Sequence, residues 1–264
     1  MTSRRWLRAT FEQVPELYER ARPTYPTELI DDLVELVRIP PRGRVVEIGP
    51  GTGQATAALA ERGLAVVGVE LGAGLADYAR RKLAQFPRVE IVNASFEDWE
   101  PDEAAFDAVV AFTAFHWVDP DARYAKPPRL LRAGGALAFV EVSHVRASGG
   151  DPFWVEVQDD YDAIVPDPAN EPPPFAEEVG DLRAQLEETG LFDEAEVRRH
   201  GWDVTYTADE YIAVLGTYSP NLARDPATTE LLFDRIRARI EARPEPHVMK
   251  RYLATLNVAR TAAA

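Results

Sequence analysis

The sequence of 264 residues contains no cysteine and no long apolar run. The lack of cysteine excludes disulfides, thiolate nucleophiles and cysteine-bound metals, and it fits a reducing cytoplasm. No stretch approaches the roughly 18 consecutive apolar residues that a membrane span needs. The opening MTSRRWLRATFEQ also lacks the apolar core of a signal peptide. We therefore expect a cytoplasmic protein without a metal site or a membrane partner.

Basic residues are also scarce relative to acidic ones. Forty-four acidic side chains against 29 basic ones give a formal net charge of −15. The resulting field repels nucleic acid phosphates, so nucleic acid is not an expected partner. Three arginines near the start, Arg4, Arg5 and Arg8, are interpreted as a solvated face. With 46% hydrophobic residues the chain can bury a sizeable core.

Short apolar runs alternate with helical patterns in the first 145 residues, as in βαβ units that build a parallel sheet. Five runs rich in Val, Ile, Ala and Phe are too short for buried helices and predict strands. These strands are at 44–48, 65–70, 89–92, 107–112 and 135–142. Helical spacing and proline or glycine boundaries predict helices at 27–38, 54–62, 74–86 and 120–132.

The alternation stops after residue 145. Residues 148–174, rich in Gly, Asp, Pro and Asn, are interpreted as an insertion or linker. Beyond them the patterns predict helices at 175–189 and 208–243, and strands at 194–206 and 250–258 that pair antiparallel at one sheet edge. We expect a doubly wound, mostly parallel seven-stranded α/β sheet. Residues 1–145 would form its core with an N-terminal lid segment, and residues 146–264 a helical cap, insertions and the last two strands.

A turn with glycine at alternate positions follows the first predicted strand: Gly49, Gly51 and Gly53. Glycine adopts positive φ and lacks Cβ, so a ligand can lie against the backbone near the positive end of the next helix. Such a turn is typical of a nucleotide-type site at the carboxyl end of a strand. The dinucleotide pattern Gly-x-Gly-x-x-Gly would need glycine at position 54, where this chain has Gln54.

An acid lies at each of the first two strand ends. Glu47 precedes the glycines, and Glu70 ends the next strand at about the separation from which a carboxylate reaches a ribose. Both hydroxyls of an unphosphorylated ribose could donate to Glu70. The alternative is a solvated acid, and the glycines upstream favour the ribose.

The segment GRVVEIGPGTGQATAALAERGLAVVGVEL resembles the first two motifs of class I S-adenosylmethionine-dependent methyltransferases. Further motifs follow in the family's order: VEIVNASFEDW, FDAVVAFTAFHWVDP and LLRAGGALAFVEV. The resemblance extends to the trans-aconitate and related small-molecule methyltransferases. It implies methyl transfer from S-adenosylmethionine to an O, N or C atom of a small-molecule acceptor. An NAD-dependent oxidoreductase, disfavoured by Gln54, and a non-catalytic S-adenosylmethionine-binding protein remain alternatives.

The resemblance also implies a set of cofactor-binding residues. They are Tyr18, Arg22, Glu47, Gly49, Gly51, Gly53, Glu70, Leu71, Ser95, Phe96, Phe112 and Thr113. The glycines would lie along the methionine and ribose portions, and Leu71 would pack on the adenine. Ser95 and the backbone of Phe96 would meet the adenine edge. Many relatives carry Asp at position 95, so this contact is weakened and Asp98 is a possible substitute.

Upstream, YERARPTYP resembles the segment in which an aromatic residue and an arginine close over the cofactor. Arg22 could pair with the methionine carboxylate through its planar fork, or with a surface acid. Tyr25 could belong to this closing segment or be a packing residue that fixes the entry into the next helix.

The acceptor should face the segment after the fourth strand, which holds His116 and Trp117. His116 could be a general base for an attacking amine or hydroxyl. Alternatively, a backbone carbonyl caps His116 while Trp117 fills the hydrophobic layer below. Methyl transfer from a sulfonium needs alignment and desolvation more than a base, which favours the structural role. Trp117 and Tyr218 are the candidate acceptor-pocket residues.

Overall fold

The computed structural model describes residues 15–193 and 195–261, and the three arginines near the start lie outside these ranges. The described chain divides into two compact units. The helical unit contains residues 15–23, Ser143–Gly180 and Gly201–Leu253. The glycine-turn unit contains Thr24–Val142, Asp181–His200 without residue 194, and residues 254–261.

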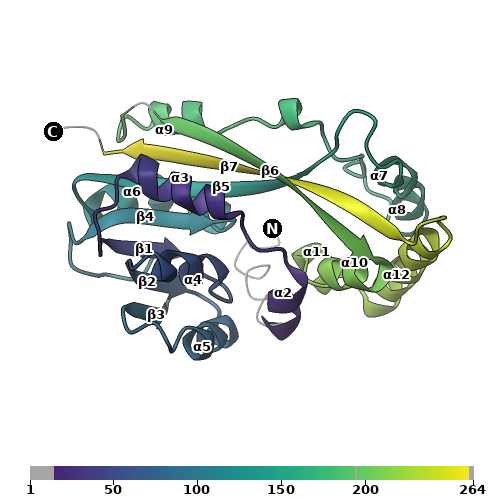
Figure 1. Ribbon diagram of the computed structural model, residues 1–264, viewed down its shortest axis with the longest axis horizontal. Helices are drawn as coiled ribbons and strands as arrows, with labels where there is room; N and C mark the ends of the chain where they lie inside the picture. Colours follow the sequence, from purple (N-terminus) through teal and green to yellow (C-terminus); the bar gives the residue numbers. More distant parts are fainter. Residues whose placement is uncertain (1–14, 194, 262–264) are drawn as a thin grey trace. The chain divides into compact units, whose positions relative to one another are not determined.

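A seven-stranded sheet has the order β3-β2-β1-β4-β5-β7-β6 (Figure 1). Its strands are β1 Arg44–Ile48, β2 Ala65–Glu70, β3 Val89–Asn93, β4 Phe106–Phe112, β5 Leu131–Val145, β6 Glu196–Thr207 and β7 His247–Arg260. The pairs within β1 to β5 are parallel, and the arrows of β6 and β7 point in opposite directions (Figure 1). The predicted doubly wound, mostly parallel sheet is confirmed. Its strand order reverses between β1 and β4, the point where such sheets bind ligands.

The helices that precede and connect the parallel strands start and end near the predicted positions. They are α3 Thr27–Val37, α4 Gln54–Glu61, α5 Ala73–Lys82 and α6 Pro120–Leu130. Asp119 caps α6 by accepting a hydrogen bond from the amide of Asp121. The other helices are α2 Pro15–Ala21, α7 Phe153–Glu156, α8 Gln158–Ile164, α9 Arg183–Glu188, α10 Ala208–Leu215, α11 Ser219–Leu222 and α12 Pro226–Glu241.

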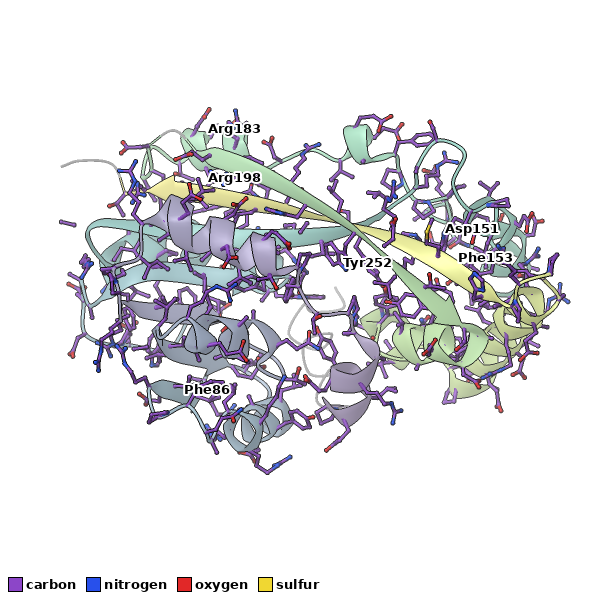
Figure 2. All side chains as sticks on the ribbon, viewed as in Figure 1. Phe86, Asp151, Phe153, Arg183, Arg198 and Tyr252 are labelled. Carbon is purple, nitrogen blue, oxygen red and sulfur yellow. The ribbon has the colours of Figure 1, made fainter. Side chains whose placement is uncertain are left out.

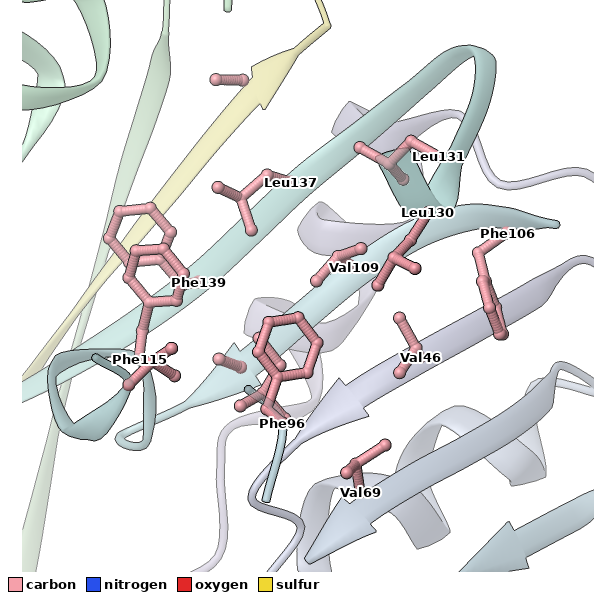
Figure 3. Close-up of a cluster of buried hydrophobic side chains, with 14 of the residues drawn as sticks. Val46, Val69, Phe96, Phe106, Val109, Phe115, Leu130, Leu131, Leu137 and Phe139 are labelled. Atoms are coloured by element: carbon pink, nitrogen blue, oxygen red, sulfur yellow. The ribbon is translucent and has the colours of Figure 1, made fainter. Parts of the chain in front are cut away.

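The core of the glycine-turn unit is an apolar cluster on β1, β2, β4 and β5 (Figure 3). All seven residues of β4 are buried, as expected of a parallel strand covered on both faces. Val46 and Val109 lie in this cluster, and β1 pairs with β4 from Val45 to Ile48. The candidate site lies at the carboxyl ends of β1 and β4. The residues that precede it on both strands are buried, so the core holds these ends in place.

Two predicted helices were wrong in extent. Residues 175–189 contain a short 3₁₀ turn at Ala176–Glu178 and α9, with Gly180 between them. Residues 208–243 form α10, α11 and α12 instead of one helix. Gly216 follows α10, and Pro220 and Pro226 lie at the first positions of the next two helices. Glycine and proline at these positions end and restart helices.

The interpretation of residues 148–174 as a linker without core elements was also wrong. These residues contain α7 and α8, and Phe153 and Trp154 on α7 are buried. Their rings pack edge-on at 4.9 Å between centroids, and both contact the ring of Tyr211 on α10. Burial of these aromatic rings outweighs the low helix propensity of the segment.

Candidate functional site

The three glycines of the turn after β1 all have positive φ, at 63° for Gly49, 59° for Gly51 and 80° for Gly53. A Cβ at Gly49 would lie 2.8 Å from the Cβ of Ala114, and one at Gly53 would lie 2.7 Å from Leu83 Cδ1. A Cβ at Gly51 would meet nothing within 4 Å. Packing thus requires glycine at the outer two positions, whereas Gly51 faces open space that a ligand can enter.

Glu70, at the end of β2, holds this turn in place. Its Oε2 accepts a hydrogen bond from the amide of Gly51 at 2.9 Å, and its Oε1 accepts one from the amide of Gly72 at 2.8 Å. A carboxylate oxygen can accept more than one hydrogen bond, so these two bonds are compatible with a ribose contact. The structure therefore brings Glu70 and Gly51 together, and the contact of Glu70 with a ribose stays a prediction.

Glu47 lies behind the turn and is 1% exposed. The hydroxyl of Thr56 on α4 donates to its Oε2 at 2.6 Å. Burial raises the pKa of Glu47 to about 7; the Thr56 hydrogen bond opposes this rise and the charge of Glu70 adds to it. A carboxyl this deeply buried joins β1 to the helix after the turn. We therefore assign Glu47 a positioning role.

The predicted adenine contacts lie at the ends of β2 and β3. Leu71 is 40% exposed, so its side chain can pack against a flat ring. The Ser95 hydroxyl donates to Asp98 Oδ2 at 2.7 Å and accepts a hydrogen bond from the Asp98 amide at 3.1 Å. Asp98 is exposed, so it can act beside Ser95 as predicted. Phe96 is buried in the core, so its side chain packs against protein.

Thr113, directly after β4, has φ of 53°. The left-handed region is rare for a β-branched residue, and such strain tends to persist at functional sites. The amide of Thr113 donates to the carbonyl of Val140 at 2.8 Å, and its hydroxyl lies 3.4 Å from that of Tyr25. The Tyr25 ring packs on Phe112, with centroids 5.0 Å apart. Tyr25 thus packs as predicted, against the end of β4.

His116 lies in a 3₁₀ turn, Phe115–Trp117, with 48% of its side chain exposed. Its Nδ1 lies 3.2 Å from Oε2 of Glu141 on β5. The expected backbone carbonyl cap is wrong, because a carboxylate occupies that position. Arg123 donates to the carbonyls of His116 and Val118 at 2.8 and 3.0 Å, which fixes the turn. A half-exposed imidazole oriented by a carboxylate is suited to proton transfer.

The hydrophobic layer below this turn is filled by Phe115, not by Trp117 as the structural interpretation required. Phe115 is buried and stacks on Phe139, with ring centroids 4.3 Å apart (Figure 3). Trp117 is only partly buried, and its ring centroid lies 5.0 Å from that of His116. Trp117 therefore lies beside His116.

Three predicted residues belong to the helical unit. The guanidinium carbon of Arg22 lies 4.2 Å from the ring centroid of Tyr218 and 5.1 Å from that of Tyr18. Arg22 Nε donates to the Thr217 hydroxyl at 2.7 Å. Sequence reasoning missed Lys250 on β7, whose Nζ donates to the Tyr218 hydroxyl at 2.8 Å. It also missed Glu141; an acid within the apolar run FVEV is its only sequence signal.

Among the described residues, no helix is long and apolar enough to span a membrane. The same residues contain no group of three or more His, Asp or Glu side chains that could hold a metal ion.

Residues 45–135 match the family described as a methyltransferase domain. An uncharacterised methyltransferase of Mycobacterium tuberculosis is 38% identical over 138 residues, which are 52% of this chain and 54% of the relative. The chain thus spans about half the length of the curated relatives it matches.

Solved structures extend the likeness to most of the chain. One from Anaeromyxobacter dehalogenans, described as a type II methyltransferase, is 26% identical with a TM-score of 0.66, covering 90% of this chain and 97% of that chain. Phosphoethanolamine N-methyltransferase 2 of Haemonchus contortus, solved with S-adenosylhomocysteine, has a TM-score of 0.54 at 15% identity. It covers 96% of this chain and 58% of that one, and it shows the fold alone.

Residues 45–135, which contain the glycine turn held by the Glu70 carboxylate, are thus similar to a methyltransferase domain. These similarities indicate a class I S-adenosylmethionine-dependent methyltransferase.

Proposed function

We propose that this protein binds S-adenosylmethionine at the glycine turn and transfers its methyl group to an O, N or C atom of a small-molecule acceptor. One observation carries the proposal. Gly51 faces open space at a φ of 59°, and its amide donates a hydrogen bond to the Glu70 carboxylate. This is a cradle that a Cβ would fill, and the family match over residues 45–135 supports its use for this cofactor.

The residues around the glycine turn fit S-adenosylmethionine. The positive end of α4, directly after the turn, suits polar ligand atoms. A carboxylate at the position of Glu70 suits ribose hydroxyls as an acceptor, and the exposed Leu71 suits the adenine ring. Asp98 beside Ser95 can accept from the adenine amino group. When bound, the cofactor supplies a methyl group on a sulfonium, which a lone pair attacks directly.

The chain's own contribution at the acceptor is orientation and proton removal. His116 can take the proton of an attacking amine or hydroxyl on one ring nitrogen. Glu141, 3.2 Å from the other, orients the ring. We therefore assign His116 as the base and Glu141 as its positioning residue.

The proposal retains a cytoplasmic reaction on a small molecule, without nucleic acid or a membrane as partner. It assigns cofactor binding to residues 1–145 and acceptor selection to residues 146–264, because loops and insertions outside the sheet core vary most between such enzymes.

The decisive experiment is mass spectrometry of the ligand that co-purifies with the protein, followed by an acceptor screen scored by S-adenosylhomocysteine release. We expect S-adenosylmethionine or S-adenosylhomocysteine, and turnover on at least one small molecule. A co-purified nicotinamide dinucleotide would support the oxidoreductase alternative. A bound cofactor without turnover on any acceptor would favour a non-catalytic binder.

A further inference from the structure

Lys126 on α6 is a buried lysine whose ammonium group binds the turn that follows β3, residues 95–100. Only 8% of the residue is exposed. Its Nζ donates to the carbonyl of Glu97 at 3.0 Å, to the carbonyl of Trp99, and to Oε1 of Glu100 at 3.4 Å. These three acceptors match the three N–H donors of an ammonium group. Lysine is rarely buried unless it is paired, so the contacts with this turn account for its position.

The same turn carries the predicted adenine contacts. The Ser95 hydroxyl donates to the Asp98 carboxylate at 2.7 Å, and the Trp99 amide closes the turn by donating to the Ser95 carbonyl at 3.0 Å. The two carbonyls that Lys126 binds belong to the residues directly before and after Asp98. The exposed carboxylate of Asp98 therefore projects from a backbone that Lys126 fixes on both sides.

The beginning of α6 contacts the turn at a second point. Asp119, the N-cap residue of the helix, donates its amide hydrogen to Oε1 of Glu97 at 2.8 Å. Lys126 lies about two helical turns further along the same helix. Two contacts from one helix limit both the rotation and the displacement of the turn.

Lys126 differs from two arginines of the same unit that pair with carboxylates. Arg198 on β6 (labelled in Figure 2) pairs with Asp32 at 2.6 Å. Arg129 on α6 pairs with Glu103 at 2.8 Å, and more than half of each side chain is exposed. Two of the three partners of Lys126 are main-chain carbonyls, so its charge fixes a backbone rather than another side chain. Its burial strengthens these hydrogen bonds, because water screens them less.

We propose that Lys126 is a positioning residue for adenine recognition, because it holds the turn at residues 95–100 so that the Asp98 carboxylate meets the adenine amino group. The inference rests on the proposed function. Asp98 contacts the base, whereas Lys126 acts through it, since the three N–H donors of Lys126 already have partners in the turn. An ionised carboxylate only accepts hydrogen bonds, so it selects a base with an amino group on C6 over one with a carbonyl oxygen there.

The test uses S-adenosylhomocysteine and S-inosylhomocysteine, in which a carbonyl oxygen replaces the amino group on C6 of the base. Each is titrated by calorimetry into the full chain freed of co-purified ligand. We expect the wild type to bind S-adenosylhomocysteine at least about tenfold more tightly, because the amino group can donate to Asp98 and the carbonyl oxygen is repelled by it. Lys126→Met should reduce this affinity ratio by at least about fivefold. Arg129→Met, on the same helix, is the matched control and should leave the ratio within about twofold.

A second measurement shows whether Lys126 acts through Asp98. Asp98→Ala should also lower the affinity ratio. Adding Lys126→Met to Asp98→Ala should lower it by less than about twofold further, because no carboxylate is left to position. If Lys126 only stabilised the fold, Lys126→Met would weaken both ligands equally and leave the ratio unchanged.

The outcomes separate the positioning role from the proposed function. Equal binding of the two ligands by the wild type, or an unchanged ratio in Lys126→Met, overturns the positioning role while methyl transfer stands. A full additional loss in the double variant, or the same loss in Arg129→Met, also overturns it. Failure of the wild type to bind S-adenosylhomocysteine refutes the proposed function itself. If Lys126→Met does not fold by circular dichroism, Lys126→Gln replaces it: its shorter side chain cannot reach both carbonyls, and an unchanged ratio overturns the proposal in the same way.

Discussion

The Glu70 carboxylate accepts the amide hydrogen of Gly51 at 2.9 Å, so the end of β2 determines the shape of the turn after β1. The second oxygen of Glu70 accepts the amide of Gly72 at 2.8 Å. The residue assigned to the ribose is therefore also the residue that holds the cofactor turn open. Mutations of Glu70 must therefore be measured both for stability and for ligand binding.

Glu70→Ala should weaken S-adenosylhomocysteine binding by about 1–3 kcal/mol, because hydrogen bonds to a charged partner are lost. It should also lower the free energy of unfolding, since two amides lose their acceptor. Calorimetry and urea unfolding measure the two effects. Asn93→Ala is the control: it removes hydrogen bonds to the carbonyls of Glu70 and Leu71 but leaves the carboxylate, and should cost less affinity. Unchanged affinity in a folded Glu70→Ala protein would remove Glu70 from the site.

Gly51→Val should abolish cofactor binding and leave most of the fold intact, because its side chain would occupy the open space at the turn. Gly63→Val is a matched control, since Gly63 also has positive φ, 79°, and a Cβ there would meet nothing within 4 Å. Left-handed strain should destabilise both variants by about 1–2 kcal/mol or more. Only the first should lose binding in calorimetry. Normal cofactor binding by Gly51→Val would show that the turn does not contact the cofactor.

Glu47 should make stability depend on pH. Burial raises its pKa from the ordinary 4.5 to about 7, so the folded state holds this proton more tightly than the unfolded state. The resulting stabilisation is complete below pH 4.5 and is lost as pH rises through 7, by up to about 3 kcal/mol. Urea unfolding across this range should show the decline in the wild type and a shallower one in Glu47→Gln, which carries no titrating proton. If the free energy of unfolding depends on pH equally in the wild type and in Glu47→Gln, Glu47 does not have the raised pKa described here.

His116→Ala should slow single-turnover methyl transfer by roughly 10²–10⁴-fold if His116 is the base. A general base must be deprotonated to act, so the wild-type rate should fall at acidic pH, and the variant should lack this acidic limb. Affinities for cofactor and acceptor must be measured separately, so that weaker binding is not mistaken for lost chemistry. Glu141→Gln should cause a smaller loss, because it changes only the orienting partner. A loss below about tenfold in His116→Ala would return His116 to a structural role.

The parallel half of the fold could be predicted from sequence because its signals are local. Buried strands form continuous apolar runs, so β1, β2 and β4 begin and end within one residue of the prediction. β5 is longer than predicted because Leu131 pairs with Phe106 before a register shift at the glycines that follow. No local pattern shows such a pairing across strands.

The site could be predicted only where its residues follow strand ends directly, as Gly51 and Glu70 do. Arg22 and Thr217 are 195 residues apart, Lys250 and Tyr218 are 32 apart, and His116 and Glu141 are 25 apart. Tertiary packing creates these pairs, so propensity and motif spacing carry no information about them. The strain at Thr113 likewise arises only in the folded chain.

The central claim is that the glycine turn binds S-adenosylmethionine, and isothermal titration of the wild-type chain tests it most directly. S-adenosylhomocysteine and NAD are titrated separately into protein freed of co-purified ligand. The account predicts one saturable site for S-adenosylhomocysteine and no measurable binding of NAD. Binding of NAD without S-adenosylhomocysteine, or binding of neither, would contradict it.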